Sequence, residues 1–322
     1  MPLHGLAHLF IILTGVHGHT TVGELILLLI CFVIFAMGQL NNREAIVVRL
    51  IDNYDRKGGN VFELLNQNNS LQRMESIYQE ISRDKDFEYI EVMNQPIEYI
   101  GKYQGSNSTV LGGANCKNQN VDGVLVTPLQ SLQISDKIQK DIGIKELIAS
   151  GKCWKNEDFF WDNVSDIKII VGHNYKNSFN VGDRISAYYL GKTKVNFQVI
   201  GILKENSSIN YLGEDVSIDN SILMPAINLK ADCMENSMFA KILYLQKVEC
   251  YARCNSMEQF EILKKQLLEI NNRYDFNYNY VECRGEGDTP MMNYVRNGIL
   301  FALFLFLFFY FFICILDCSI VK

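Results

Sequence analysis

Two long apolar runs stand near the ends of the chain, and almost every charged residue lies between them. Val22 to Leu40 is nineteen residues with a single charge, Glu24, and Ile299 to Leu316 is eighteen residues with none. Because an α-helix rises about 1.5 Å per residue, roughly 20 residues cross the hydrocarbon of a bilayer. We therefore predict transmembrane helices at 22–40 and 297–316, with a buried core helix as the alternative for each run.

The first run is expected to stay in the protein as an anchor rather than to be removed as a signal peptide. Its apolar stretch exceeds the usual length of about 7–15 residues, and no Lys or Arg precedes it. Residues 1–21 are then a cytoplasmic or interfacial segment. Its histidines are interpreted as polar residues near a membrane surface, because no Cys or paired carboxylate joins them to suggest a metal site (His4, His8, His17 and His19).

Helical and alternating patterns fill residues 41–296, which are long enough for one large domain or two smaller ones. From Ser70 onward, apolar residues recur at helical spacing, and a strand pattern follows at 87–92. A second strand pattern at 247–254 precedes a helix that begins at the capping box Ser256-Met257-Glu258-Gln259, and a returning strand follows at 276–281. These two helix-then-strand units predict two βαβ-type lobes, with the chain leaving near where it entered.

Strand patterns dominate the region between these units. Ile167 to Val171 is a short apolar strand, and 185–190 and 195–203 form a hairpin with turn residues at both of its ends. The predicted fold class is therefore α+β: an extracytoplasmic domain with two βαβ-type lobes and a β-rich subdomain, flanked by two transmembrane helices. Residues 41–296 form that domain, and 317–322 form a short cytoplasmic tail.

Composition narrows the class of protein further. Of the 322 residues, 48% are hydrophobic and 20% are charged, which is typical of a folded chain and excludes disorder. The net charge of −6 provides no positive field for phosphates, so we expect no nucleic-acid partner.

No pattern in the sequence indicates catalysis, and we predict no catalytic, cofactor-binding or metal-binding residues and no cofactor. Gly191-Lys192-Thr193 resembles the end of a phosphate-binding loop, but Ser186 occupies the position of the leading Gly, and the context is strand–turn–strand. His173 is the only histidine of the central domain and is interpreted as a solvated turn residue. The chain is therefore predicted not to be an enzyme.

Six of the nine cysteines lie in the central domain (Cys116, Cys153, Cys233, Cys250, Cys254 and Cys283). They permit up to three disulfides in any of fifteen pairings, and buried free thiols are the other interpretation. Both stay open, except that Cys250 and Cys254 are not expected to pair with each other. Four extended residues would place these two about 13 Å apart, beyond the reach of a disulfide.

Several short sequence words occur in the order found in a known family. Gly151 to Phe159 (GKCWKNEDF) looks like the GR-x-F-x-x-x-D stretch of the MacB-like periplasmic core domain. Further words of the same pattern follow over about 80 residues (IIVG at 169–172, VGDRI at 181–185, FQVIGIL at 197–203 and IDNSILMP at 218–225). The central domain therefore resembles that of an FtsX/MacB-type ABC transporter permease.

The resemblance implies a function and an orientation. Such permeases transmit ATP-driven motion to a domain outside the cytoplasm, for export, extraction or signalling. It implies a cytoplasmic ABC ATPase, a second permease in a homo- or heterodimer and membrane lipids as partners, and a multi-pass protein of the cell membrane. Arg43, Arg49 and Arg296 beside the domain would place it in the cytoplasm by charge counting. Long domains, however, translocate largely regardless of charge.

The resemblance is incomplete. The family has four membrane spans, with its ATPase-coupling segment between the second and third, whereas this chain runs six residues beyond Leu316. We therefore expect a truncated or split permease, or an accessory that cannot couple to an ATPase alone. The alternative is a two-span membrane sensor with an extracellular ligand-binding domain, which would pass its signal to a partner. A membrane-anchored adhesion or scaffolding domain is a third interpretation.

Overall fold

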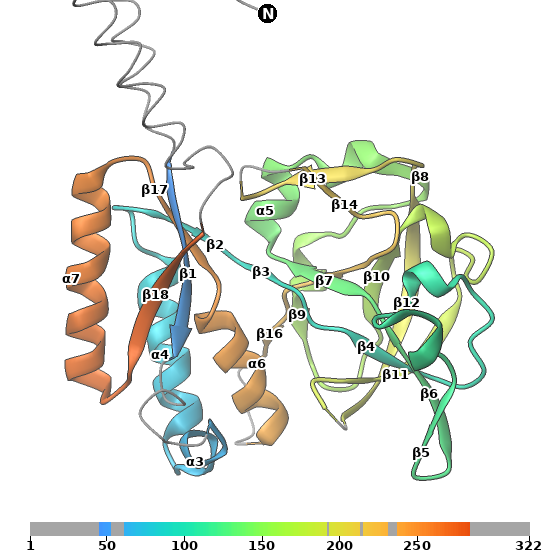
Figure 1. Ribbon diagram of the computed structural model, residues 1–322, viewed down its shortest axis with the longest axis horizontal. Helices are drawn as coiled ribbons and strands as arrows, with labels where there is room; N and C mark the ends of the chain where they lie inside the picture. Colours follow the sequence, from blue (N-terminus) through green and yellow to red (C-terminus); the bar gives the residue numbers. More distant parts are fainter. Residues whose placement is uncertain (1–44, 53–60, 192, 213–214, 231–236, 284–322) are drawn as a thin grey trace, which may run out of the picture. The chain divides into compact units, whose positions relative to one another are not determined.

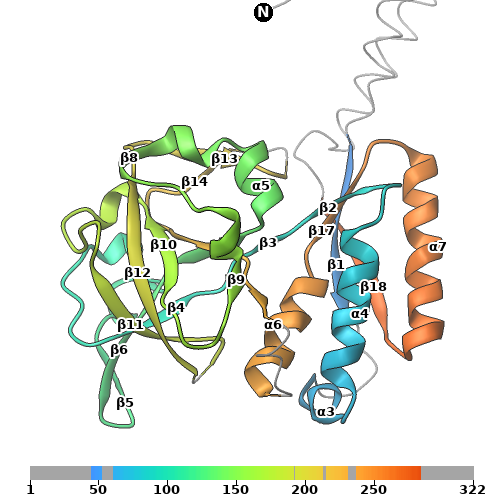
Figure 2. The same ribbon diagram turned by 180° about the vertical axis from the view of Figure 1, so that it is seen from behind.

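The computed structural model describes residues 45–52, 61–191, 193–212, 215–230 and 237–283 (Figures 1 and 2). All of these except Ala45 belong to one compact unit. They form a mixed α/β fold on two main sheets, one of four strands and one of ten, with two small two-stranded sheets beside them.

The four-stranded sheet joins the two ends of the described chain. Its strands lie in the order β18 (Tyr278–Cys283), β1 (Ile46–Asp52), β17 (Tyr251–Cys254) and β2 (Glu88–Ile90), and all neighbours are antiparallel. Each βαβ unit leaves a gap between its parallel strands, and a strand of the other unit fills it: β17 lies between β1 and β2, and β1 lies between β17 and β18. The two predicted βαβ lobes are therefore halves of a single sheet.

Helices α4 (Ser70–Ser82) and α7 (Met257–Tyr274) cover one face of this sheet (Figures 1 and 2). Both follow the predicted pattern: α4 buries residues at helical spacing, and α7 begins at the Ser256 cap, whose hydroxyl accepts from the Gln259 amide. The buried positions of α7 are the ones that the spacing predicts (Phe260, Leu263, Leu267 and Ile270). Two further helices, α3 (Val61–Asn66) and α6 (Met238–Val248), pack beside α4.

The ten-stranded sheet is inserted between β2 and β17, and Figure 1 shows it curled. Its path begins at β3 (Val92–Met93) and ends at β5 (Gln119–Val121). The strands between these edges, in spatial order, are β7 (Ser131–Ile134), β15 (Ile222–Pro225), β10 (Ile167–Val171), β12 (Thr193–Leu203), β11 (Arg184–Tyr189), β4 (Ile97–Ile100) and β6 (Val124–Leu129). The tenth, β8 (Ile148–Gly151), pairs with β12.

Smaller elements complete the inserted part. Strands β13 (Ser208–Asn210) and β14 (Asp215–Ser217) form one two-stranded sheet, and β9 (Phe160–Trp161) and β16 (Asn228–Leu229) form the other. Helix α5 (Asp136–Asp141), capped by Ser135, accompanies these strands. Short 3₁₀ turns occupy the connections (Asn107–Thr109, Gly113–Cys116, Ile144–Leu147, Asn156–Phe159 and His173–Tyr175).

Two glycines allow segments of the ten-stranded sheet to approach closely. A Cβ on Gly172 would lie 2.4 Å from the carbonyl oxygens of Ile218 and Asp219, and one on Gly151 would lie 2.2 Å from the carbonyl oxygen of Ile200. These separations are far inside van der Waals contact, so only glycine fits at both positions.

The sequence prediction of one strand needs correction. Residues 247–254 alternate like a strand, but Lys247 and Val248 are the last residues of helix α6, and β17 begins only at Tyr251. The buried positions of α6 continue at helical spacing to Val248, and for Lys247 and Val248 this packing outweighs the preference of the short alternating pattern for a strand. The predicted strands at 167–171 and the hairpin at 185–203 are confirmed as β10, β11 and β12.

The predicted fold class as a whole is wrong. In place of two βαβ lobes and a β-rich subdomain flanked by transmembrane helices, the described residues form a mixed α/β fold with a large curled sheet. No helix in this part of the chain is long and apolar enough to cross a membrane. The runs at 22–40 and 297–316 lie outside the described residues.

Candidate functional site at the junction of the two sheets

His173 and the Gly191-Lys192-Thr193 turn, for which the sequence predicts no chemical role, are not brought together into a site. His173 lies in a turn, where its Nε2 is 2.7 Å from the Lys176 ammonium and 3.8 Å from a Glu205 carboxylate oxygen. Gly191 ends the β11–β12 turn and Thr193 begins β12, while Lys192 is outside the described residues. Among the residues that the structure describes, no cluster of His, Cys, Asp or Glu could hold a metal ion.

The cysteines of the described residues are free thiols (Cys116, Cys153, Cys250, Cys254 and Cys283), and Cys233 lies outside that part of the chain. Cys250 is completely buried. Its burial, and to a smaller extent the negative charge of the nearby Glu91 carboxylate, raises the pKa of its thiol from 9.0 to about 12. A neutral thiol of this kind is a poor nucleophile at physiological pH.

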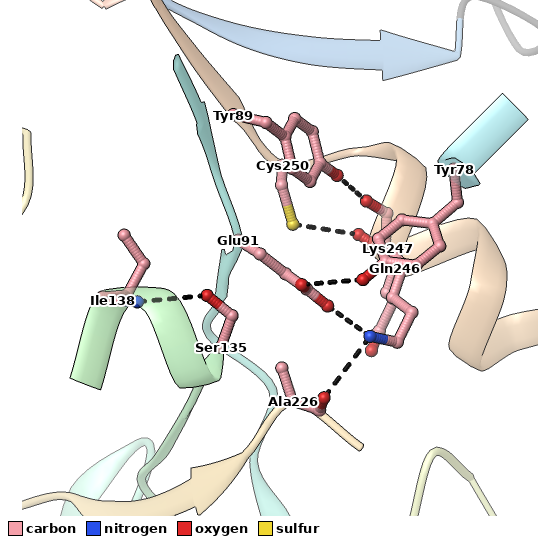
Figure 3. A network of polar contacts seen from close by, with 9 residues as sticks. All are labelled: Tyr78, Tyr89, Glu91, Ser135, Ile138, Ala226, Gln246, Lys247 and Cys250. Carbon is pink, nitrogen blue, oxygen red and sulfur yellow. Dashed lines mark hydrogen bonds and ion pairs between the residues drawn. The ribbon is translucent and has the colours of Figure 1, made fainter. Parts of the chain in front are cut away.

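A buried ion pair joins Glu91 and Lys247 (Figure 3). The Lys247 side chain is 0% exposed, and that of Glu91 is 8% exposed. Lysine and glutamate are almost never buried to this degree unless they are paired, because removing a charge from water costs several kcal/mol or more. The pair is therefore a costly arrangement whose partners depend on one another.

Hydrogen bonds complete the surroundings of both charges. The Tyr78 hydroxyl of α4 donates to the second carboxylate oxygen of Glu91 at 2.9 Å, and the Lys247 ammonium also lies 3.4 Å from the Ala226 carbonyl oxygen. The ammonium sits 4.7 Å from the centre of the Tyr78 ring, a cation–π contact. Burial, and then the negative charge of Glu91, raise the pKa of Tyr78 far above its ordinary value, so the hydroxyl stays a donor.

The end of helix α6 is fixed to the four-stranded sheet by side chains from separate elements. The hydroxyl of Tyr89 in β2 donates to the Lys247 carbonyl, and that of Tyr278 in β18 donates to the Val248 carbonyl. The thiol of Cys250 lies 3.4 Å from the Gln246 carbonyl oxygen. The last carbonyls of a helix have no partner within it. Here the Lys247 and Val248 carbonyls accept from the four-stranded sheet, while the Gln246 carbonyl also accepts from the Glu249 N–H.

These residues join the two connections between the sheets. The chain leaves the four-stranded sheet through Glu91, which stands between β2 and β3, and returns to it through α6, which carries Lys247. A second contact joins the same connections, where the Gln246 amide donates to the Gln95 side-chain oxygen at 2.7 Å. The cluster therefore forms a joint that binds the outgoing chain to the returning chain.

Glu91, Lys247 and Tyr78 were not among the candidate residues predicted from the sequence. A signal for two of them was present: Glu91 interrupts the apolar stretch Tyr89 to Met93, and Lys247 stands in the apolar helix MFAKILYLQKV. A lone charge inside an apolar segment predicts a buried partner of opposite charge. The pairing itself joins residues 156 positions apart and was not accessible from local patterns.

Comparisons with protein-family models, with curated proteins and with solved structures return no match to this chain. The resemblance to FtsX/MacB-type permeases therefore rests on the sequence words alone.

Proposed function

We propose that the described residues act as the extracytoplasmic domain of a membrane-anchored, permease-type subunit of an ABC transporter. In this role the domain transmits ATP-driven motion to export, extraction or signalling outside the cytoplasm. The subunit works in a dimer with another permease and depends on a cytoplasmic ABC ATPase, reached directly or through a fuller permease.

The observation that carries the proposal is where the chain enters and leaves the domain. Val47 of β1 lies opposite Cys283 of β18 in an antiparallel pair, so the segments before and after the domain attach to neighbouring strands at one end of the sheet. Apolar sequence lies beyond each attachment, at 22–40 and 299–316. A relative movement of the two flanking segments would act directly on two hydrogen-bonded strands of the domain.

The positions of the family words give further support. The first word begins at the last residue of β8 and continues through the connection to the 3₁₀ turn Asn156–Phe159, and the others fall on β10, the turn leading into β11, β12 and the approach to β15; β8, β10, β11, β12 and β15 lie close together in the ten-stranded sheet. Glycines of these words face the backbone of other words: Gly151 approaches Ile200, and Gly172 approaches Ile218 and Asp219. The words thus share one packing arrangement, which is a physical reason for them to occur together.

The joint of Glu91 and Lys247 suits the same role. A domain that passes movement from one sheet to another needs stiff connections, and a buried, hydrogen-bonded ion pair between both connections resists their separation. Because the pair joins residues distant in the chain, it couples the sheets without depending on the stiffness of the loops.

The test is to isolate the full chain from the membranes of its source organism in a mild detergent and to identify its stoichiometric partners. We expect an ABC ATPase together with a second permease subunit. Recovery alone, or with a histidine kinase, would contradict the proposal and favour the sensor interpretation.

The location of the domain is tested in intact cells. Val164 is 87% exposed, so V164C places a thiol where a membrane-impermeant maleimide reaches it. We expect V164C to add label in intact cells above the background of the unsubstituted chain. Added label only after lysis would place the domain in the cytoplasm and refute this part of the proposal.

A further inference from the structure

The strand that leaves the four-stranded sheet presents carboxylates to opposite faces. Side chains alternate along a strand, so Tyr89 and Glu91 point toward the helices, and Glu88 points toward the face that α4 and α7 leave uncovered. Glu91 meets Lys247 of α6, and Glu88 meets Arg253 of β17. Lys247 belongs to the returning helix, whereas Arg253 is the cross-strand neighbour of Glu88 within the four-stranded sheet, and this ion pair holds the guanidinium on the helix-free face.

The contact on the helix-free face also includes the hairpin β13–β14. Arg253 donates through Nη1 to a Glu88 carboxylate oxygen at 2.9 Å and through Nη2 to the carbonyl oxygen of Tyr211, directly after β13, at 2.6 Å. Lys137 of α5 approaches the other Glu88 oxygen at 3.2 Å. A planar guanidinium suits this arrangement because its separate N–H groups hold two acceptors at once.

An apolar contact lies beneath these polar groups. The Tyr211 ring meets the Tyr251 ring edge to face, with centroids 6.3 Å apart. Both rings pack against the core that contains Ile90 of β2 and Ile209 of β13. The hairpin, which shares its core with the ten-stranded sheet, is therefore seated on the β17–β2 half of the helix-free face.

The ion pairs on the two faces of the sheet differ in how easily water reaches them. The Glu91–Lys247 pair is buried, whereas Lys137 and Glu88, whose ion pair joins α5 to β2, have side chains that are 56% and 27% exposed. Partly exposed ion pairs are weakened by salt and exchange with water, while a buried pair is screened much less. The contact at Glu88 can therefore open while the pair at Glu91 stays closed.

We propose, on the basis of the force-transmitting role above, that two contacts form a releasable latch between the inserted part and the four-stranded sheet: the ion pair of Lys137 with Glu88 and the hydrogen bond from Arg253 to the Tyr211 carbonyl oxygen. The Glu91–Lys247 pair is the fixed pivot, and the hairpin lifts from the sheet when the latch opens. The opening exposes the Tyr251 ring and Ile90 on the helix-free face.

The closed state is also favoured by the charge state of Glu88. Burial raises the pKa of this carboxyl, but the ammonium of Lys137 and the guanidinium of Arg253 outweigh that effect and hold the pKa below its ordinary value. Glu88 is thus ionised throughout the physiological range, and the latch is controlled by salt and by force on the strands.

The test measures the distance between the hairpin and the sheet in the purified full chain. Spin labels are attached through non-canonical residues that replace Val216 of β14 and Val281 of β18, which are 36% and 45% exposed. Pulsed electron paramagnetic resonance then gives the distribution of distances between the two labels. We expect one short distance at low salt and a second, longer distance in E88Q, with the open-to-closed ratio raised roughly tenfold. The matched control is K140M, which removes an ion pair within helix α5 alone.

A second measurement keeps the proposal testable if E88Q fails to fold. Raising the salt from about 0.1 M to 1 M shortens the screening length from about 10 Å to about 3 Å, so the unsubstituted latch should gain the same longer distance. A distribution unchanged by both E88Q and salt would overturn the latch. Because the measurement needs no ATPase, that result would leave the transporter proposal standing, and failed co-purification would leave the latch standing.

Discussion

Replacing Lys247 by methionine tests whether the buried pair holds the two sheets together. Methionine fills a similar volume but leaves the Glu91 carboxylate, in a residue only 6% exposed, with the Tyr78 hydroxyl as its remaining donor among the residues drawn in Figure 3. Removing one partner of a buried pair costs about 3–5 kcal/mol, because the other charge stays buried without compensation. Since domains are stable by about 5–15 kcal/mol, K247M should lose roughly a fifth or more of its free energy of unfolding.

The assay is urea unfolding of the full chain in detergent, followed by tryptophan fluorescence. The chain has two tryptophans, Trp154 and Trp161, which are 5% and 7% exposed in the inserted part, so the signal reports loss of that structure. Far-ultraviolet circular dichroism follows the helices in parallel. The matched control is K140M, whose exposed pair with Asp136 is worth about 0.3–0.5 kcal/mol.

A double variant separates the pair from the packing around it. K247M/E91Q removes both charges, while the glutamine amide oxygen introduced by E91Q would still accept from Tyr78, so we expect stability within about 1 kcal/mol of the unsubstituted protein. The coupling energy between the two sites should then exceed about 2 kcal/mol. A loss below about 1 kcal/mol in K247M, or a double variant as unstable as the sum of the single ones, would refute the reasoning.

Two further substitutions are checked in the same unfolding assay, and the burial of Cys250 is checked by labelling. Y278F removes the hydroxyl that donates to the Val248 carbonyl and should cost about 0.5–1.5 kcal/mol; no change would mean that water replaces it. G172A forces a methyl group against the Asp219 carbonyl oxygen and should cost about 1–3 kcal/mol, and an unaffected variant would show that the backbone moves apart easily. Cys250 should resist a thiol reagent at pH 8 until urea unfolds the chain, as mass spectrometry would show, and rapid labelling of the folded protein would contradict its burial. Because folding raises the pKa of Cys250 from 9.0 to about 12, its neutral form is favoured in the folded state, and this contribution to stability is lost as the pH rises from about 9 to about 12.

Local patterns in the sequence were enough to find the two helices that cover the four-stranded sheet and, in part, the strands β2, β17 and β18, whereas β1 was not predicted. The spacing of Leu71, Met74 and Ile77 predicts α4, and the capping box at Ser256 predicts the start of α7. These features depend on neighbours within four residues, which the sequence displays directly. How the strands combine was not predictable in this way, because the pairing of Ile46 with Cys254 joins residues more than 200 positions apart.

The same limit applies to the candidate site. Its members come from α4, the β2–β3 link and α6, and no spacing rule connects them. The interpretation of Lys247 as a strand residue concealed its helical surroundings, in which a buried cation demands a partner. Charge within an apolar segment indicates that such a partner exists but does not identify it.

The arrangement of β1 imposes an order on the synthesis of the protein. This apolar strand is made early, yet its partners are β17 and β18, so Val48 has no sheet neighbour until the segments around Ala252 and Glu282 have been made. At about 5–20 residues per second, the ribosome needs roughly 10–40 s to produce the intervening chain. The inserted sheet, whose strands pair among themselves, can fold within that interval. The four-stranded sheet therefore closes last, and its first strand must be kept from pairing with other chains until then.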